Sequence, residues 1–438
     1  MRLAAGVLAI VLPLCGADVR TFGAIGDGVA DDSAAISAAM ADAVAARGPL
    51  RIPQGTYRFT SGLTFGSSHL YVVCEPGAIL QFAGVGAVVT FSAEAPHTLN
   101  NVGMENCAIE GNAAATDGIV LHRAHHVMFR NVSVRNVSGA CLRTQFSVAG
   151  TYTNFRCSNG EAPLTVHASS GIVLGEDGPG EQTTASTFLT PIVEGVTGNG
   201  IVLDSAANIV FTGGTSENNH GGWGMTVGPR SANITVIGMD FEDNAAGSVE
   251  SFGTETLFVN VLAAGAFRVG SGARGNTIAN SRVHQVIFDP GAYNNVMREN
   301  DYAIEDGKAE PVDHGANNSV FGNYNAGTQR YAAGYIRFPV TPASALLAAA
   351  DPRAAALRLT GEWMDISNAA VTGEWRAVFI GSWSAAEAQA LTEVTAAAPA
   401  LAVAAGAVYF RRDETTLRVQ ARTDAPAVQF TGAFAIVP

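Results

Sequence analysis

A repeat in the central part of the chain restricts its fold more than any other feature. The repeated unit has a polar residue, two apolar residues separated by one position, and then asparagine or glycine, and it recurs within residues 97–326. Its copies end at Asn131, Gly213, Gly238, Asn260, Asn280, Asn300 and Asn323, and the last six ends are separated by 25, 22, 20, 20 and 23 residues. Such a period, with strand-like alternation inside each unit, predicts a solenoid of short strands. Asparagine and glycine suit a left-handed turn between two strands.

Each unit also carries an earlier strand of the type GIVL, at 118–121 and 200–203, and a similar GMTV stands at 224–227. Three short strands in about 20 residues are typical of one coil of a right-handed parallel β-helix. A β-sandwich also has strands at intervals of about 8 to 12 residues, but its strands would not keep asparagine or glycine at one place in every cycle. We therefore predict an all-β, right-handed parallel β-helix over residues 18–330.

The first coil of a β-helix exposes its edge and its core, so that end needs a cap. Asp31, Asp32 and Ser33 stand where N-caps stand, and the following stretch AAISAAMADAVAARG predicts a helix that ends at Gly48. The segment FGAIGDGVADDSAAI, followed by IPQGTY, resembles the N-terminal signature of the pectate-lyase-like superfamily. The resemblance implies a capped β-helix that faces carbohydrate. It does not specify a reaction, because fold and function separate in this group of lyases, hydrolases, epimerases and tailspikes.

After residue 327 the repeat stops, and alternating strands follow an alanine-rich stretch. We predict that residues 335–438 form a small β domain of sandwich type. Trp363, Trp375 and Trp383 lie in this domain. Packing in its core is the simpler interpretation of these tryptophans, and stacking on sugar rings is the alternative.

The charge of the 438-residue chain argues against nucleic acid as a partner. The net charge is -13, and Lys308 is the single lysine among 25 basic residues. Neutralising phosphates requires a clustered basic surface, which the sequence lacks. A polysaccharide is the partner that fits better, either neutral or bridged by cations.

The N-terminus predicts export. Residues 1–17 have a charged start, a twelve-residue apolar run and a small-residue exit, as a signal peptide requires. A lipid anchor through Cys15 and an apolar strand of the cap are the alternatives. We expect a secreted, periplasmic or cell-surface protein without a transmembrane segment. The other four cysteines can then form disulfides or stay buried as thiols, and their spacing does not decide between these states.

Equivalent outward positions of successive coils stack at about 4.8 Å in a parallel β-helix, so aligned repeat ends predict a surface. Two positions past the repeat ends the outward column reads Ser133, Thr215, Asp240, Leu262 and Arg282, and four positions past them it reads Arg135, Glu217, Glu242, Ala264 and His284. The positions between them are Val134, Ser216, Phe241, Ala263 and Val283, as expected for an inward column.

This alignment places Glu217 and Glu242 on adjacent coils with Asp240 beside them. Two carboxylates one coil apart repel each other when both are ionised, so one of the two glutamates should keep a proton, and an acid beside an ionised carboxylate can hydrolyse a glycosidic bond. His284 could instead serve as a base for β-elimination, with Arg282 neutralising a uronate. A divalent cation such as calcium, held by the three carboxylates, is a third possibility, and a solvated acidic stripe is the simplest.

The segment ENNHGGWG offers Asn218, His220 and Trp223 at a coil corner as residues that could bind the sugar. We expect a polysaccharide-binding and polysaccharide-cleaving protein, with hydrolysis favoured over elimination because carboxylates outnumber basic groups in the predicted groove. The alternative is a glycan-binding protein without activity, similar to a tailspike or an adhesin. A monomer would fit the enzyme, and a homotrimer would fit the spike.

Overall fold

The computed structural model describes residues 16–157, 165–301, 312–315, 318–321 and 323, and beyond these only the backbone of strands between 324 and 436. The predicted signal peptide, Lys308, Trp363 and Trp383 therefore lie outside the described residues, apart from the last residues of the peptide. The chain comprises two compact units, residues 1–197 and 198–438. Among the described residues, no helix has the length and apolar character that spanning a membrane requires.

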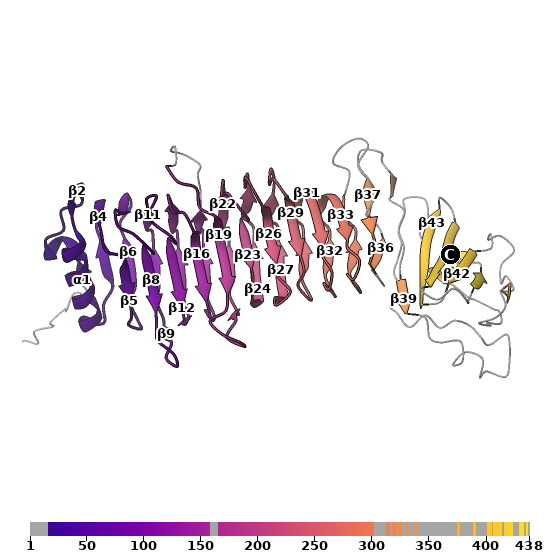
Figure 1. Ribbon diagram of the computed structural model, residues 1–438, viewed down its shortest axis with the longest axis horizontal. Coiled ribbons are helices and arrows are strands. Elements are labelled where there is room, and N and C mark those ends of the chain that lie inside the picture. Colours follow the sequence, from indigo (N-terminus) through magenta and orange to yellow (C-terminus); the bar gives the residue numbers. More distant parts are fainter. Residues whose placement is uncertain are drawn as a thin grey trace, which may run out of the picture. The chain divides into compact units, whose positions relative to one another are not determined.

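The first unit is a stack of parallel coils, each built from up to three short strands (Figure 1). One stack of parallel strands consists of β1 (Ala17–Asp18), β3 (Leu50–Ile52), β6 (Tyr71–Cys74), β10 (Gly103–Glu105), β14 (Met128–Arg130), β17 (Thr151–Thr153) and β21 (Thr187–Leu189). The second consists of β2 (Asp27–Asp31), β4 (Gly55–Phe59), β7 (Ala78–Phe82), β11 (Ala108–Glu110), β15 (Ser133–Arg135), β18 (Arg156–Cys157) and β22 (Ile192–Glu194). The third consists of β5 (Leu63–Phe65), β8 (Val89–Ser92), β12 (Ile119–His122), β16 (Ala140–Gln145) and β19 (Ser170–Gly175). Three further short strands lie at the corners of these coils, namely β9 (Leu99–Asn100), β13 (Ala124–His125) and β20 (Thr183–Thr184).

The N-terminal cap consists of the 3-10 helix η1 (Val19–Phe22) and the helix α1 (Ser33–Ala46), which lies at the indigo end of the strand stacks in Figure 1. Helix α1 buries Ile36, Ala39 and Ala43. Asp32, the residue before the helix, accepts hydrogen bonds from the backbone of Ile25 and Gly26 and so fixes the glycine-rich loop. The helix ends at Ala46, two residues before Gly48, and Arg47 rather than Gly48 adopts the left-handed conformation.

The second unit continues with the same kind of coil, as the repeat predicts. One parallel stack consists of β24 (Ala206–Thr212), β27 (Ala232–Ile237), β30 (Leu257–Val259), β32 (Thr277–Ala279), β34 (Val296–Arg298) and β36 (Ser319–Phe321). The other strands are β23 (Ile201–Leu203), β25 (Thr215–Glu217), β26 (Trp223–Val227), β28 (Asp240–Phe241), β29 (Gly247–Ser251), β31 (Leu262–Val269), β33 (Arg282–Phe288) and β35 (Val312–Asp313). The predicted right-handed parallel β-helix is therefore confirmed.

The C-terminal region contains further strands, in agreement with the predicted β structure there. They are β37 (Tyr324–Asn325), β38 (Arg330–Tyr331), β39 (Arg337–Pro339), β40 (Trp375–Arg376), β41 (Gln389–Ala390), β42 (Leu401–Ala404), β43 (Gly406–Asp413), β44 (Thr416–Thr423), β45 (Gln429–Gly432) and β46 (Ala435–Ile436). Six of them form one sheet in the order β39-β43-β44-β42-β45-β41. The boundary near residue 335 stays a prediction.

Left-handed residues mark the corner of each coil. The backbone has φ between 48° and 64° at Asn106, Asn131, Asn154, Thr190, Gly213, Gly238, Asn260, Asn280 and Glu299. The sequence alignment was wrong at two places. It skipped the coils that turn at Asn154 and Thr190, so Ser133 and Arg135 are followed in their stack by the coils of Arg156 and Ile192. It also placed one corner at Asn300, whereas Glu299 turns and Asn300 is buried.

Aromatic rings fill the core of the first unit. Phe65 stacks on Phe91, and the series continues through Phe129 and Tyr152 to Phe188, with centroid distances of 4.3 to 6.0 Å. Two disulfides, Cys74–Cys107 and Cys141–Cys157, cross-link this unit. Disulfides persist in oxidising compartments, which accords with the predicted export.

Buried asparagines replace apolar residues at one corner of the second unit. The backbone N–H of Asn276 donates to Oδ1 of Asn295 at 3.0 Å, and the N–H and side-chain amide of Asn295 both donate to Oδ1 of Asn318 at 3.0 Å. Each amide thus satisfies the backbone of the neighbouring coil, which no apolar side chain can do.

We predict that Asn295→Ala lowers the free energy of unfolding by about 3 kcal/mol, because several buried polar groups lose their partners. Asn294→Gly is the matched control. Asn294 is exposed and has a φ of 56° that glycine adopts easily. Urea denaturation of both variants measures the difference, and equal midpoints would contradict a structural role of the buried asparagines.

Candidate functional site

The structure brings together three of the carboxylates that the sequence singled out. Thr215 at the start of β25 pairs with Asp240 of β28, Asp240 pairs with Leu262, and Leu262 pairs with Arg282. This is the predicted column. One oxygen each of Glu217, Asp240 and Glu242 lies within 4.8 Å of one oxygen of the other two. We refer to these three residues as the acidic cluster.

Burial and repulsion act in the same direction on Asp240. Removal from solvent is the largest cause, followed by the charges of Glu242 and Glu217, and together they raise the pKa of Asp240 to about 6. Its Oδ1 is inaccessible and has no hydrogen-bond partner among the residues that the structure describes. An unpartnered buried oxygen stabilises the neutral acid relative to the carboxylate. Asp240 therefore keeps its proton to a higher pH than an ordinary aspartate, up to about pH 6.

Arg282 and His284 lie apart from the acidic cluster. Leu262 separates Arg282 from Asp240, so the two are two coils apart, or about 10 Å along the column. A β-bulge between Ala263 and Ala266 interrupts the second predicted column, which contains Ala264 and His284. The ring Nδ1 of His284 lies at hydrogen-bond distance from the carbonyl oxygen of Ala264.

The corner residues occupy different environments. Asn218 is exposed, follows Glu217 directly and donates its backbone N–H to the carbonyl oxygen of Glu242 at 3.1 Å. His220 is exposed in the same turn. Trp223 is half-buried at the start of β26 and lies against Gly247 of the next coil, where a Cβ would come within 2.4 Å of its ring. Whether these three residues bind sugar stays a prediction.

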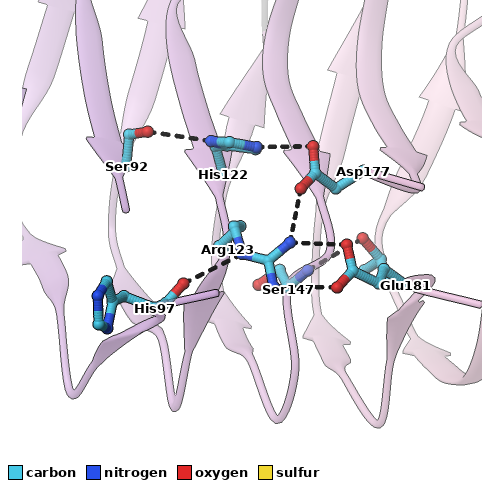
Figure 2. A network of polar contacts seen from close by, with 8 residues as sticks. Ser92, His97, His122, Arg123, Ser147, Asp177 and Glu181 are labelled. Atoms are coloured by element: carbon cyan, nitrogen blue, oxygen red, sulfur yellow. Dashed lines mark hydrogen bonds and ion pairs between the residues drawn. The ribbon is translucent and has the colours of Figure 1, made fainter. Parts of the chain in front are cut away.

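The sequence analysis missed a second polar cluster, in the first unit (Figure 2). Arg123 is only 4% exposed, and its guanidinium donates to Asp177 at 2.7 Å and to Glu181 at 2.6 and 3.0 Å. His122 lies between two partners, with Nε2 at 2.8 Å from Oδ1 of Asp177 and Nδ1 at 3.0 Å from Oγ of Ser92. We call Ser92, His122, Arg123, Asp177 and Glu181 the serine–histidine network.

Little in the sequence indicates this network. Asp177 and Glu181 come from the segment between β19 and β20, outside every repeat, so the column alignment could not place them. The dipeptide His122-Arg123 after a GIVL strand was the available signal, because Arg123 then stands at a corner where buried charge requires partners.

Comparison with known proteins identifies the family of this chain. Residues 17–270 match the model of rhamnogalacturonase A/epimerase, pectate lyase-like proteins, which is more than half of the chain. The chain belongs to this family. The match includes the acidic cluster and the serine–histidine network but ends before Arg282.

The proteins to which this pectate lyase-like chain is similar have names that describe different activities. Mannuronan C5-epimerase AlgE4 of Azotobacter vinelandii is 35% identical over 118 residues, which are 24% of this chain and 21% of the epimerase. The match thus spans about a fifth of that relative.

Solved structures share the fold. The A-module of mannuronan C-5 epimerase AlgE6 from Azotobacter vinelandii has a TM-score of 0.53 at 20% identity, over 70% of this chain and 99% of the module. An exopolygalacturonase of Thermotoga maritima has a TM-score of 0.53 at 9% identity, over 72% of this chain and 92% of the exopolygalacturonase. ORF18 of Geobacillus virus E2 has a TM-score of 0.56 at 17% identity, over 74% of this chain and 66% of the viral protein. At these identities the likeness establishes the fold alone.

The raised pKa of Asp240 makes the stability of this pectate lyase-like protein depend on pH. The folded protein holds the Asp240 proton more tightly than the unfolded chain, whose aspartates titrate near 3.8. Its stabilising contribution is complete below about pH 4 and is lost as pH rises through about 6.

We predict that Asp240→Asn raises the stability of the folded protein by about 1 to 2 kcal/mol at pH 8 and has little effect at pH 4. Asparagine carries no charge at either pH and so avoids the penalty of ionising this site. Asp243→Asn, in the exposed turn next to it, is the control for the loss of one charge. Thermal unfolding at both pH values tests the prediction, and a difference that does not change with pH would contradict it.

Proposed function

We propose that this protein hydrolyses glycosidic bonds of a polysaccharide outside the reducing cytoplasm, and that the acidic cluster performs the reaction. Membership of a family of polysaccharide-acting β-helix proteins supports the substrate class. One observation carries the choice of reaction. A carboxylic acid with a pKa of about 6 stands beside two further carboxyl groups, all with an oxygen within 4.8 Å of the others.

Glycosidic cleavage requires this combination of groups. An acid must protonate the oxygen of the leaving sugar, and a carboxylate must attack the anomeric carbon or take a proton from the attacking water. In our proposal Asp240 is the acid, and Glu217 and Glu242 supply the carboxylate. The two glutamates also keep Asp240 protonated, because each ionised neighbour opposes its ionisation.

Elimination fits the geometry less well than hydrolysis. That reaction needs a base at the proton beside a uronate and a positive charge to stabilise the resulting anion. Arg282 lies two coils from Asp240, and His284 directs Nδ1 at a backbone carbonyl. The carboxylates of Glu217 and Glu242 would repel a uronate bound next to them, so a neutral sugar at the point of cleavage fits better.

We predict that the purified chain releases reducing ends from a polysaccharide in a panel of neutral and acidic polymers, without the ultraviolet absorbance of unsaturated products. Glu242→Gln should lower the rate by about 100-fold or more, because one carboxylate of the pair is lost. Glu255→Gln, an exposed change in the same unit, is the matched control and should leave the rate unchanged.

Two results of this assay would overturn the proposal. Ultraviolet absorbance with every reducing end would identify elimination. Binding of a glycan without any product would identify a binding protein of the tailspike or adhesin type, and the mass of the assembly would then decide between a monomer and a trimer.

Proton and cation compete for the acidic cluster, since three carboxylate oxygens can also bind calcium. The proposal requires the proton. We expect activity to survive chelation by EDTA and to fall about tenfold per pH unit above pH 6, as Asp240 loses its proton. Activity that depends on added calcium, or that rises with pH between 6 and 8, would assign the cluster to metal binding instead.

A further inference from the structure

The serine–histidine network contains a chain of hydrogen bonds that the glycosidase proposal does not use. Ser92 ends β8 and His122 ends β12, and the two are direct partners on adjacent coils. Asp177 reaches His122 from the segment after β19 (Figure 2). The contacts Ser92 Oγ to His122 Nδ1 and His122 Nε2 to Asp177 Oδ1 measure 3.0 and 2.8 Å.

The charges of the network determine the direction of these hydrogen bonds. Bonds from Arg123, followed by the bond from His122, lower the pKa of Asp177, so this residue is a carboxylate that can only accept. His122 must therefore carry a proton on Nε2, and in the neutral imidazole Nδ1 then has a lone pair. The hydroxyl of Ser92 is then the donor to Nδ1, and this is the arrangement of a serine next to its general base.

Arg123 holds the network in place from a backbone conformation that is unfavourable for a bulky residue. Arg123 and Phe146 both adopt a φ of 55°, which bulky residues avoid. The guanidinium lies 4.9 Å from the centre of the Phe146 ring and is neutralised by Asp177 and Glu181. A buried arginine with two carboxylate partners fixes the segment that carries Asp177, and so fixes the position of the His122 ring.

Ser92 is half-buried rather than part of the closed core. Gly66 follows the strand β5 that pairs with β8, and it is exposed. A Cβ built at Gly66 would meet only the carbonyl oxygen of Ser92, at 3.9 Å. His122 and Asp177 each expose 25% of their side chains. The serine–histidine network is thus partly accessible rather than enclosed in the core.

From this arrangement we propose that Ser92, His122 and Asp177 form a second active site, which hydrolyses an O-acyl ester such as an acetyl group on a sugar. Only the sugar part of this substrate rests on the proposed function. Ser92 is the nucleophile, His122 is the general base and acid, and Asp177 is a positioning residue.

The reaction proceeds in two balanced steps. Ser92 Oγ attacks the carbonyl carbon while its proton moves to Nδ1 of His122, and collapse of the tetrahedral intermediate breaks the ester bond as Nδ1 returns the proton to the sugar oxygen. Water then attacks the acyl-serine, giving its proton to Nδ1. The second collapse releases the carboxylic acid and restores the hydroxyl of Ser92. No oxidant, metal or further reactant is needed.

We expect a fluorophosphonate probe to label the full chain once, at Ser92, as found by intact mass and peptide mapping. The protein should also release acetate from an O-acetylated polysaccharide and from p-nitrophenyl acetate. Ser92→Ala and His122→Ala should lose labelling and acetate release by about 100-fold or more. A folded wild-type protein that is neither labelled nor active on these esters overturns the proposal, as does labelling that persists without His122.

Asp177→Asn separates a positioning role from a merely structural one. Its carboxylate lies at hydrogen-bond distance from Nε2 of His122 and is paired with Arg123, which Glu181 also contacts. Removing the carboxylate should slow labelling about 10-fold or more and move its pH midpoint to a lower value. A variant with an unchanged midpoint would restrict Asp177 to holding its own segment.

The two proposals fail independently. Ser92→Ala should keep the release of reducing ends, and Glu242→Gln should keep the release of acetate, because the acidic cluster and the serine–histidine network share no residue. Loss of both activities in either variant, with native thermal unfolding, would contradict the assignment of two separate sites.

Discussion

The fold depends on one constraint, which is that each coil must turn at a residue in the left-handed conformation and then resume pairing in register. Asparagine and glycine adopt this conformation at low cost, and they occupy most of these corners. Because the corner fixes the register, an outward side chain faces one partner on the adjacent coil about 4.8 Å away, except at a β-bulge such as that between Ala263 and Ala266. Local turn chemistry therefore decides which functional groups meet, although these groups come from residues 20 or more positions apart.

The same constraint explains what could be predicted from the sequence. Glu217, Asp240 and Glu242 were placed correctly because their corners are Gly213 and Gly238, which have a clear signal. The coil at Thr190 was missed because threonine rarely turns in this way, and the coil at Asn154 because its repeat pattern is weak. The corner at Glu299 was misplaced by one residue, since the buried Asn300 beside it has the composition of a corner.

Repulsion along the column predicted a raised pKa for one of the two glutamates, whereas the raised pKa belongs to Asp240, and its largest cause is burial, which register alone does not give. The serine–histidine network could not be predicted either. Asp177 and Glu181 lie in a segment between strands, where the period of the repeat places nothing, and their partner Arg123 is a buried charge at a left-handed position. Long-range ion pairs of this kind depend on the path of one loop, which no periodic pattern encodes.

The two clusters show how one scaffold gives the same side chain opposite properties. Asp177 meets a buried guanidinium and an imidazole, which lower its pKa, whereas Asp240 meets two glutamates and loses solvent, which raise it. A carboxylate that stays ionised can orient a histidine, and a carboxyl that stays protonated can donate to a leaving group. Asp177 lies in a segment between strands and Asp240 in a column of stacked strands, so the difference comes from burial together with the sign of the neighbouring charges. This is a physical reason why a family defined by its coils can contain hydrolases and epimerases, and why the reaction of one member has to be argued from its own columns.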